Sequence, residues 1–120
     1  MNFNDFKTAL TSLIGATTQR LPTLGRKSFF HVYFDKQGNV VLKNSKGNIN
    51  IITQADFNIC KAQYCSLHGK ERFDGKKYTD PELRSPIGRT HAPLIPAIFR
   101  YLCENNYCVC QDCKQGTCLI

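Results

Sequence analysis

Residues 28–53 decide the fold, and they read SFFHVYF-DKQG-NVVLK-NSKG-NINIIT. Two turn signals, at 35–38 and 44–47, separate three runs of β-branched and aromatic residues. An Asp or Asn followed three residues later by glycine is typical of a type I turn whose last residue has positive φ, closing a three-residue hairpin loop with a glycine bulge. We therefore predict a three-stranded antiparallel meander. Its strands cover 28–35, 39–43 and 48–53.

The alternation of side chains along a strand divides this meander into two faces. One predicted face is almost wholly apolar and must be buried against helices: Phe30, Val32, Phe34, Val40, Leu42, Ile49 and Ile51. The other predicted face is mixed: Phe29, His31, Tyr33, Val41, Lys43, Asn48, Asn50 and Ile52. A mixed face of this kind is a stacking surface in proteins that bind single-stranded nucleic acid. The alternative, which we favour because a three-stranded sheet usually needs cover, is that a loop or helix partly covers it.

Three helices are expected around the meander. The first covers 4–14, with Asn4 as its cap and apolar residues at helical spacing. The second begins at Thr53 and continues to about residue 65, because TQAD resembles a capping box with an acid at its third position. The last lies within 92–105, where Pro93 suits the first turn and Pro96 delays the regular start.

The fold class that follows is α+β, with the three-stranded meander packed against about three helices. A chain of 120 residues suits one domain. We predict a single domain over 1–107 and a Cys-rich tail over 108–120. Between the second and last helices, residues 66–92 form a long, basic and mostly irregular segment, and loops of that length are usually functional or disordered.

The charge of the chain favours a polyanionic partner. Sixteen Lys and Arg against nine Asp and Glu leave a formal charge of +7. Such a field attracts nucleic acid, an anionic surface or an acidic protein, although it also serves solubility alone. We expect a non-catalytic nucleic-acid-binding protein, with DNA favoured over RNA and a homodimer as one arrangement. The candidate phosphate contacts are Arg26, Lys27, Lys43, Lys46, Lys70, Arg72, Lys76, Lys77, Arg84 and Arg89.

Two other function classes stay open. One is an interaction module that binds an acidic protein, such as an accessory factor or inhibitor. The other is a small nuclease or toxin in which His68 and His91 run acid–base cleavage of a phosphodiester. The sequence contains neither a phosphate-cradling glycine loop nor a nucleophile elbow. We therefore favour non-catalytic polar roles for the histidines, and we expect no enzyme activity.

The N-terminus lacks the basic and apolar regions of a secretory signal, and no stretch is long and apolar enough to cross a membrane. These features favour the cytoplasm, where thiols stay reduced, and no membrane partner is expected. Seven cysteines is an odd number, which argues against a closed disulfide framework. We therefore expect reduced, partly buried thiols.

The tail CVCQDCKQGTC still raises the alternative of a metal site. Cys110 and Cys113 have the C-x2-C spacing that chelates Zn²⁺, and Cys108 and Cys118 complete four ligands. Structural zinc sites generally use two pairs on separated segments, and here all four cysteines crowd into one run. A second grouping joins Cys60 and Cys65 to Cys103 and Cys108, although Cys60 lies on an apolar helix face and suits the core. No cofactor is the expectation, with zinc as the alternative.

Overall fold

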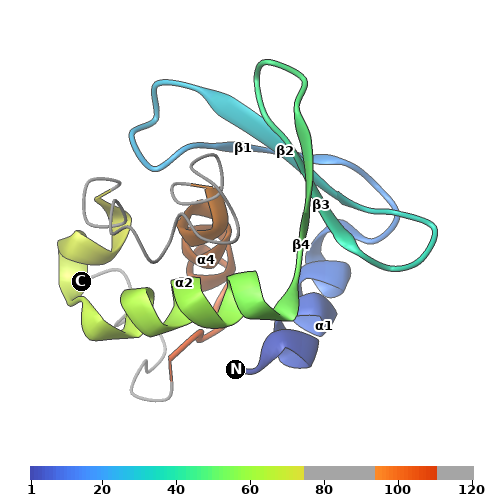
Figure 1. The fold of residues 1–120 in the computed structure, drawn as a ribbon. Coiled ribbons are helices and arrows are strands. Elements are labelled where there is room, and N and C mark those ends of the chain that lie inside the picture. Colours follow the sequence, from blue (N-terminus) through green and yellow to red (C-terminus); the bar gives the residue numbers. More distant parts are fainter. Residues whose placement is uncertain (75–93, 111–120) are drawn as a thin grey trace.

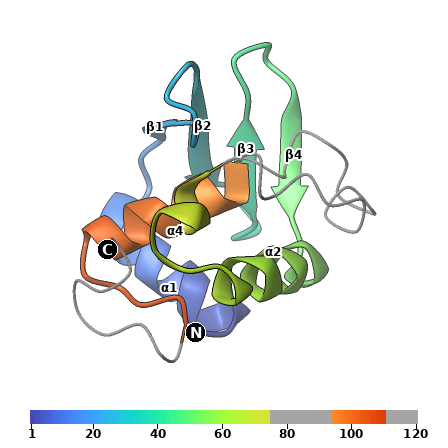
Figure 2. The same cartoon turned by 90° about the vertical axis from the view of Figure 1, so that its left-hand side faces the viewer.

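The fold, in a computed structural model that describes residues 1–74 and 94–110, is α+β with a four-stranded antiparallel sheet. The sheet forms one layer, and the helices lie together against one of its faces (Figures 1 and 2). The elements run in the order α1 (Phe3–Ile14), β1 (Gln19–Pro22), β2 (Phe29–Phe34), β3 (Val40–Lys43), β4 (Ile49–Ile52), α2 (Gln54–Ser66), the 3₁₀ helix η1 (Gly69–Phe73) and α4 (Leu94–Glu104).

The two predicted turns are confirmed, and they set the register of the sheet. Gly38 and Gly47 have φ of 79° and 87°, the left-handed region that favours glycine. In each turn the glycine N–H donates to the carbonyl of Asp35 or Asn44, at 3.0 Å in both cases. The loops therefore close at Asp35 with Asn39 and at Asn44 with Asn48. The strand order is β1-β2-β3-β4, and the predicted three-stranded meander corresponds to β2, β3 and β4.

The sheet has one strand more than predicted. β1 pairs antiparallel with β2, so that Leu21 faces Phe30 across the ladder. β1 was not expected because its residues, QRLP, offer one large apolar side chain and end in proline. Proline is tolerated at the edge of a sheet, where its missing N–H costs no ladder hydrogen bond. Burial of Leu21 and pairing with β2 stabilise β1, although the strand propensity of its own residues is low.

The predicted faces are correct for β2 and β3 but wrong for β4. Ile49 and Ile51 are 58% and 48% exposed, whereas Ile52 is 2% exposed and belongs to the core. The register explains the error, because Lys43 pairs with Ile49 and Val41 with Ile51. Cross-strand partners lie on the same face of a sheet, so both isoleucines share the outer face with Lys43. Asn50 then lies on the inner face opposite Leu42.

The helices cap and pack largely as the local sequence predicts. The capping box at Thr53 is confirmed, since its hydroxyl accepts from the Asp56 N–H while the Asp56 carboxylate accepts from the Thr53 N–H. The cap of α1 lies two residues earlier than predicted, at Asn2 in place of Asn4, and Asp5 completes a capping box there. α4 begins at Leu94, so Pro96 lies inside its first turn, where no intrahelical N–H bond is required.

A cluster of aromatic rings joins α1, α2 and α4 beneath the sheet. Phe6 of α1, Phe57 of α2 and Phe99 of α4 are all fully buried, and their ring centroids lie 5.0–5.9 Å apart. Tyr64 extends the cluster along α2, 5.1 Å from Phe99. The sheet completes this core through Phe30 and Val32 of β2, Val40 and Leu42 of β3, and Ile52 of β4. The division into a domain over 1–107 and a tail over 108–120 stays a prediction.

Asp35 offers a test of the turn chemistry. Its carboxylate accepts from the Gln37 and Asn39 N–H groups, at 3.0 and 2.8 Å, and these bonds hold its pKa below its ordinary value of 3.8, the Asn39 bond most strongly. Asn44 accepts the equivalent pair of bonds in the second turn, from Lys46 and Asn48. Asp35→Asn should therefore keep the turn and remove its titration.

The sign of the pH effect follows from the lowered pKa. The stabilisation by the Asp35 carboxylate is fully present above the unfolded value near 3.8 and is lost as pH falls through the folded value. Wild type should therefore lose stability relative to Asp35→Asn as pH is lowered from neutral to about 2. Urea unfolding midpoints of the two proteins across this range measure the difference. A difference that stays constant with pH would contradict the assignment.

Candidate nucleic-acid interface

The outer face of the sheet is a small grid of aromatic, apolar and basic side chains. One row across the sheet, given by the register, is Arg20, His31, Lys43 and Ile49. The neighbouring row is Tyr33, Val41 and Ile51. Adjacent strands lie about 4.8 Å apart, so each row places its side chains next to one another. None of the strand residues on this face is acidic.

Arg20 and Phe29 form a stacked pair at one edge of this face. The guanidinium carbon of Arg20 lies 3.9 Å from the centroid of the Phe29 ring, and the ring remains 44% exposed. A guanidinium stacked on a ring keeps its N–H groups in its own plane, where they are free to bind a phosphate. Arg20 was not among the predicted contacts, because recognising it required knowledge that β1 joins the sheet.

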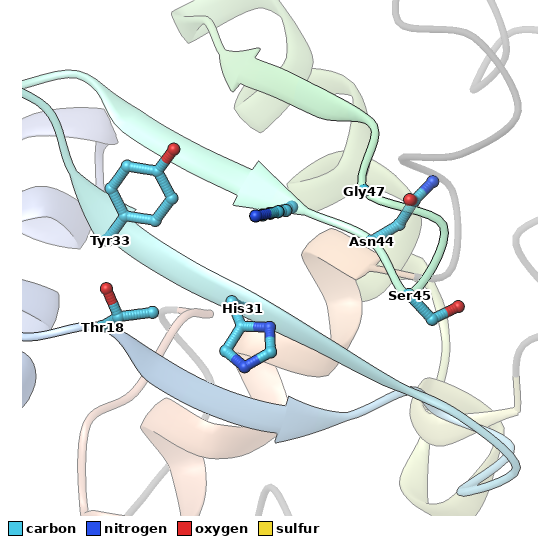
Figure 3. Close-up of a pocket in the computed structure, with 7 residues that line it drawn as sticks. Thr18, His31, Tyr33, Asn44, Ser45 and Gly47 are labelled. Atoms are coloured by element: carbon cyan, nitrogen blue, oxygen red, sulfur yellow. The ribbon is translucent and has the colours of Figure 1, made fainter.

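A hollow of about 420 Å³ opens on the same face, and one of its lining residues, His31, pairs with Arg20 across the ladder. Figure 3 shows His31 and Tyr33 projecting from β2, with the 44–47 turn on the other side of the opening. Its lining residues are Thr18, His31, Tyr33, Lys43, Asn44, Ser45 and Gly47. Of these, only Lys43 was a predicted site residue. His31 and Tyr33 were expected on the mixed face, but not as site residues. Asn44, Ser45 and Gly47 could have been found because they form the predicted turn that follows Lys43, whereas Thr18 could not, since it precedes the unpredicted strand β1.

Nine of the ten predicted cations divide into three groups, and Arg72 stands apart from them. Arg26 and Lys27 lie in the β1–β2 loop and Lys46 lies in the β3–β4 turn, and both connections leave the sheet at the same end (Figure 2). Lys43 lies just below that end, in the hollow, and these four cations are all exposed. Lys70 is exposed in η1, on the helical side of the fold. Four predicted contacts lie outside the described residues: Lys76, Lys77, Arg84 and Arg89.

Arg72 is the predicted contact that the structure argues against. Its side chain is 5% exposed, its Nε donates to the Leu67 carbonyl at 2.8 Å, and its guanidinium lies 4.9 Å from the centre of the Tyr64 ring. A guanidinium held in this way joins η1 to α2 and does not present its charge to a phosphate. The sequence pattern of alternating basic residues did not distinguish Arg72 from Lys70, because 3₁₀ geometry turns neighbouring side chains to different sides.

Arg100 is a buried cation that sequence reasoning missed. It is 6% exposed in α4 and donates to the carbonyls of Pro22, Thr23 and Leu24, at 3.4, 3.1 and 3.4 Å. Burial lowers its pKa, the charge of Arg26 adds to this, and Glu104 opposes it from 3.8 Å. Arg100 therefore anchors the start of the loop that carries Arg26 and Lys27.

The cysteines are arranged differently from the expectation of reduced thiols. Cys65 and Cys110 form a disulfide that joins the end of α2 to the segment after α4. Cys60 is fully buried and its pKa is raised to about 12 by burial, which agrees with a core role. Cys103 is also buried, with its sulfur 3.1 Å from the Tyr64 hydroxyl. The grouping of Cys60, Cys65, Cys103 and Cys108 around a metal is therefore not formed.

Only two of the four cysteines of the predicted zinc site lie within the described residues. Cys108 is a half-buried thiol, Cys110 is in the disulfide, and Cys113 and Cys118 lie outside the described residues. A disulfide sulfur is not a thiolate ligand, so this pairing and zinc binding at Cys110 exclude one another. Within residues 1–74 and 94–110, no three His, Cys, Asp or Glu side chains gather as a metal site would require.

The proposed histidine pair is likewise only half described. His68 is exposed and precedes η1, whereas His91 lies outside the described residues.

Comparison with known proteins brings no match, neither to a family model, nor to a curated protein, nor to a solved structure. None of the described helices is long and apolar enough to cross a membrane.

Proposed function

We propose that the chain binds single-stranded DNA across the outer face of its sheet. The observation that carries the proposal is the composition of that face. It places Arg20, His31 and Lys43 in one row beside the exposed ring of Phe29 and the half-buried ring of Tyr33, with no carboxylate between them. Single-strand binders combine a basic path for the backbone with aromatic side chains on which bases stack.

The arrangement of the loops supports the same partner. Arg26, Lys27 and Lys46 surround the end of the sheet next to Lys43, so a strand that crosses the row meets further cations there. An acidic protein also suits this charge, but charge alone does not use the rings of Phe29 and Tyr33. Stacking on such rings contributes about 1–3 kcal/mol per base, which a carboxylate-bearing partner does not gain.

Binding of a thymidine oligonucleotide should fall with rising salt, because phosphate contacts release counterions. Each contact to a single strand contributes about 0.7 to the slope of log K against log salt, so Arg20→Gln combined with Lys43→Gln should reduce the slope by about 1.4. Fluorescence anisotropy across a salt series measures both quantities. Lys7→Gln, on α1 in the helical layer, is the matched control and should leave the slope unchanged.

The partner class is tested in the same assay. The affinities for RNA and duplex DNA of equal length are compared with that for the single strand. Polyglutamate is titrated as a stand-in for an acidic protein. Absence of DNA binding at low salt would reject the proposal. Equal affinity for polyglutamate and for the oligonucleotide would favour the acidic-protein alternative, because the face would then respond to charge alone.

A further inference from the structure

The hollow on the outer face holds more hydrogen-bond donors than the described residues satisfy. The described part of the chain provides no hydrogen-bond or ion-pair partner for the Tyr33 hydroxyl, the Lys43 ammonium or the Asn44 side-chain NH₂. Thr18 and Ser45, which carry hydroxyls, also line the hollow. An ammonium and an amide NH₂ are donors only, so they favour a ligand rich in acceptor oxygens.

Asn44 is held in one orientation by the turn. Its Oδ1 accepts from the N–H groups of Lys46 and Asn48, at 3.0 and 2.9 Å. Because that oxygen is occupied, only the NH₂ end of the side chain remains to meet a ligand. A donor that is already oriented loses little conformational entropy on binding, which strengthens recognition.

The other wall of the hollow is aromatic. His31 and Tyr33 alternate along β2 onto the same face, and Figure 3 shows both rings at the opening. A volume of about 420 Å³ lies within the range of pockets that hold small molecules. The side of the hollow formed by His31 and Tyr33 therefore suits a flat ring, and the side formed by Lys43 and Asn44 suits an anion.

We propose that this hollow binds one nucleotide, with its base against the His31 and Tyr33 rings and its phosphate on Lys43 and Asn44. The proposal rests on the proposed function, since it selects one point on the outer face where a single nucleotide of a DNA strand is bound. The shared chemistry is a nucleoside phosphate, free or within a strand. Lys46, although on the same turn and exposed, does not line the hollow.

Titration of the ¹⁵N-labelled chain with thymidine 5′-monophosphate tests the site by NMR. Amide shifts should concentrate on Thr18, on His31 and Tyr33, and on the 44–47 turn. Thymidine, which lacks the phosphate, should bind at least about tenfold more weakly, because hydrogen bonds to charged groups are the strong ones. Lys43→Met should lower the affinity for the monophosphate about tenfold, and Lys46→Met should change this affinity by less than about twofold.

Three outcomes would overturn the proposal. They are equal affinity for thymidine and its monophosphate, equal loss in Lys43→Met and Lys46→Met, and shifts that avoid the hollow. A thymidine oligonucleotide in the same titration separates the two proposals. If the oligonucleotide binds while the monophosphate does not, the single-nucleotide site is wrong and the DNA-binding face stands. If neither binds, both fail.

Discussion

Replacing Cys65 with serine is expected to lower the free energy of unfolding by about 4 kcal/mol. The disulfide to Cys110 spans a sequence separation of 45, and closing a loop of that length removes about this much entropy from the unfolded chain. It also holds the segment after α4 against the end of α2. Because domains are stable by only about 5–15 kcal/mol, this one bond is a large share of the total.

Urea unfolding of the two oxidised proteins measures this loss. Cys108→Ser is the matched control, since Cys108 is a free, half-buried thiol two residues from Cys110 and its loss should cost less than about 1 kcal/mol. Reduction of wild type should reproduce the effect of Cys65→Ser. Equal stability of Cys65→Ser and Cys108→Ser would show that the bond does not form in solution.

The second large effect is expected from Phe99→Ala, which should cost about 3–5 kcal/mol of unfolding free energy. Phe99 is fully buried, and its ring contacts Phe6, Phe57 and Tyr64 at centroid distances of 5.9, 5.8 and 5.1 Å. It thus joins α4 to α1 and α2, and truncation leaves a cavity that the surrounding helices cannot easily fill. Denaturant unfolding monitored by circular dichroism measures the change.

Phe29→Ala is the contrasting variant. Its ring is 44% exposed on the outer face, so its removal should cost less than about 1 kcal/mol of stability. It should instead weaken oligonucleotide binding, because a base loses its stacking partner and Arg20 loses its support. A large stability loss in Phe29→Ala, or a small one in Phe99→Ala, would contradict the assignment of the two faces.

Much of the architecture follows from local sequence, because its causes are local. A glycine at positive φ three residues after Asp35 or Asn44 closes each hairpin without help from the rest of the chain. The capping box at Thr53 acts over three residues in the same way. For these features the side chain and the backbone group that it satisfies are neighbours in sequence.

The faces of β4 were also determined by the sequence, although the pattern of isoleucines suggested otherwise. A three-residue loop between 44 and 48 makes Lys43 the partner of Ile49, so the two cannot lie on opposite faces. Reading hydrophobicity alone assigned Ile49 and Ile51 to the core. The register imposed by the turn prevailed over hydrophobicity, and it leaves both side chains about half exposed.

The candidate site was predicted less completely than the fold. Lys43 and the rings of β2 were recognised on a mixed sheet face, since strand alternation is a local property. Arg20 and Thr18 were missed because β1 owes its place to pairing with β2 and to the three bonds from Arg100 to the loop that follows it. Those partners are separated by about 76–78 residues, beyond the reach of any local pattern.

The sequence by itself determined the hairpin turns, the register between β2, β3 and β4, the capping of α2 and the excess of positive charge. Only the tertiary structure decided which basic residues face solvent, since Arg72 and Arg100 are buried while Lys43 lines the hollow. It also decided that Cys65 pairs with Cys110. The physical reason is the same in each case: turns and caps depend on neighbours along the chain, whereas burial and pairing depend on residues that meet only when the helices pack beneath the sheet.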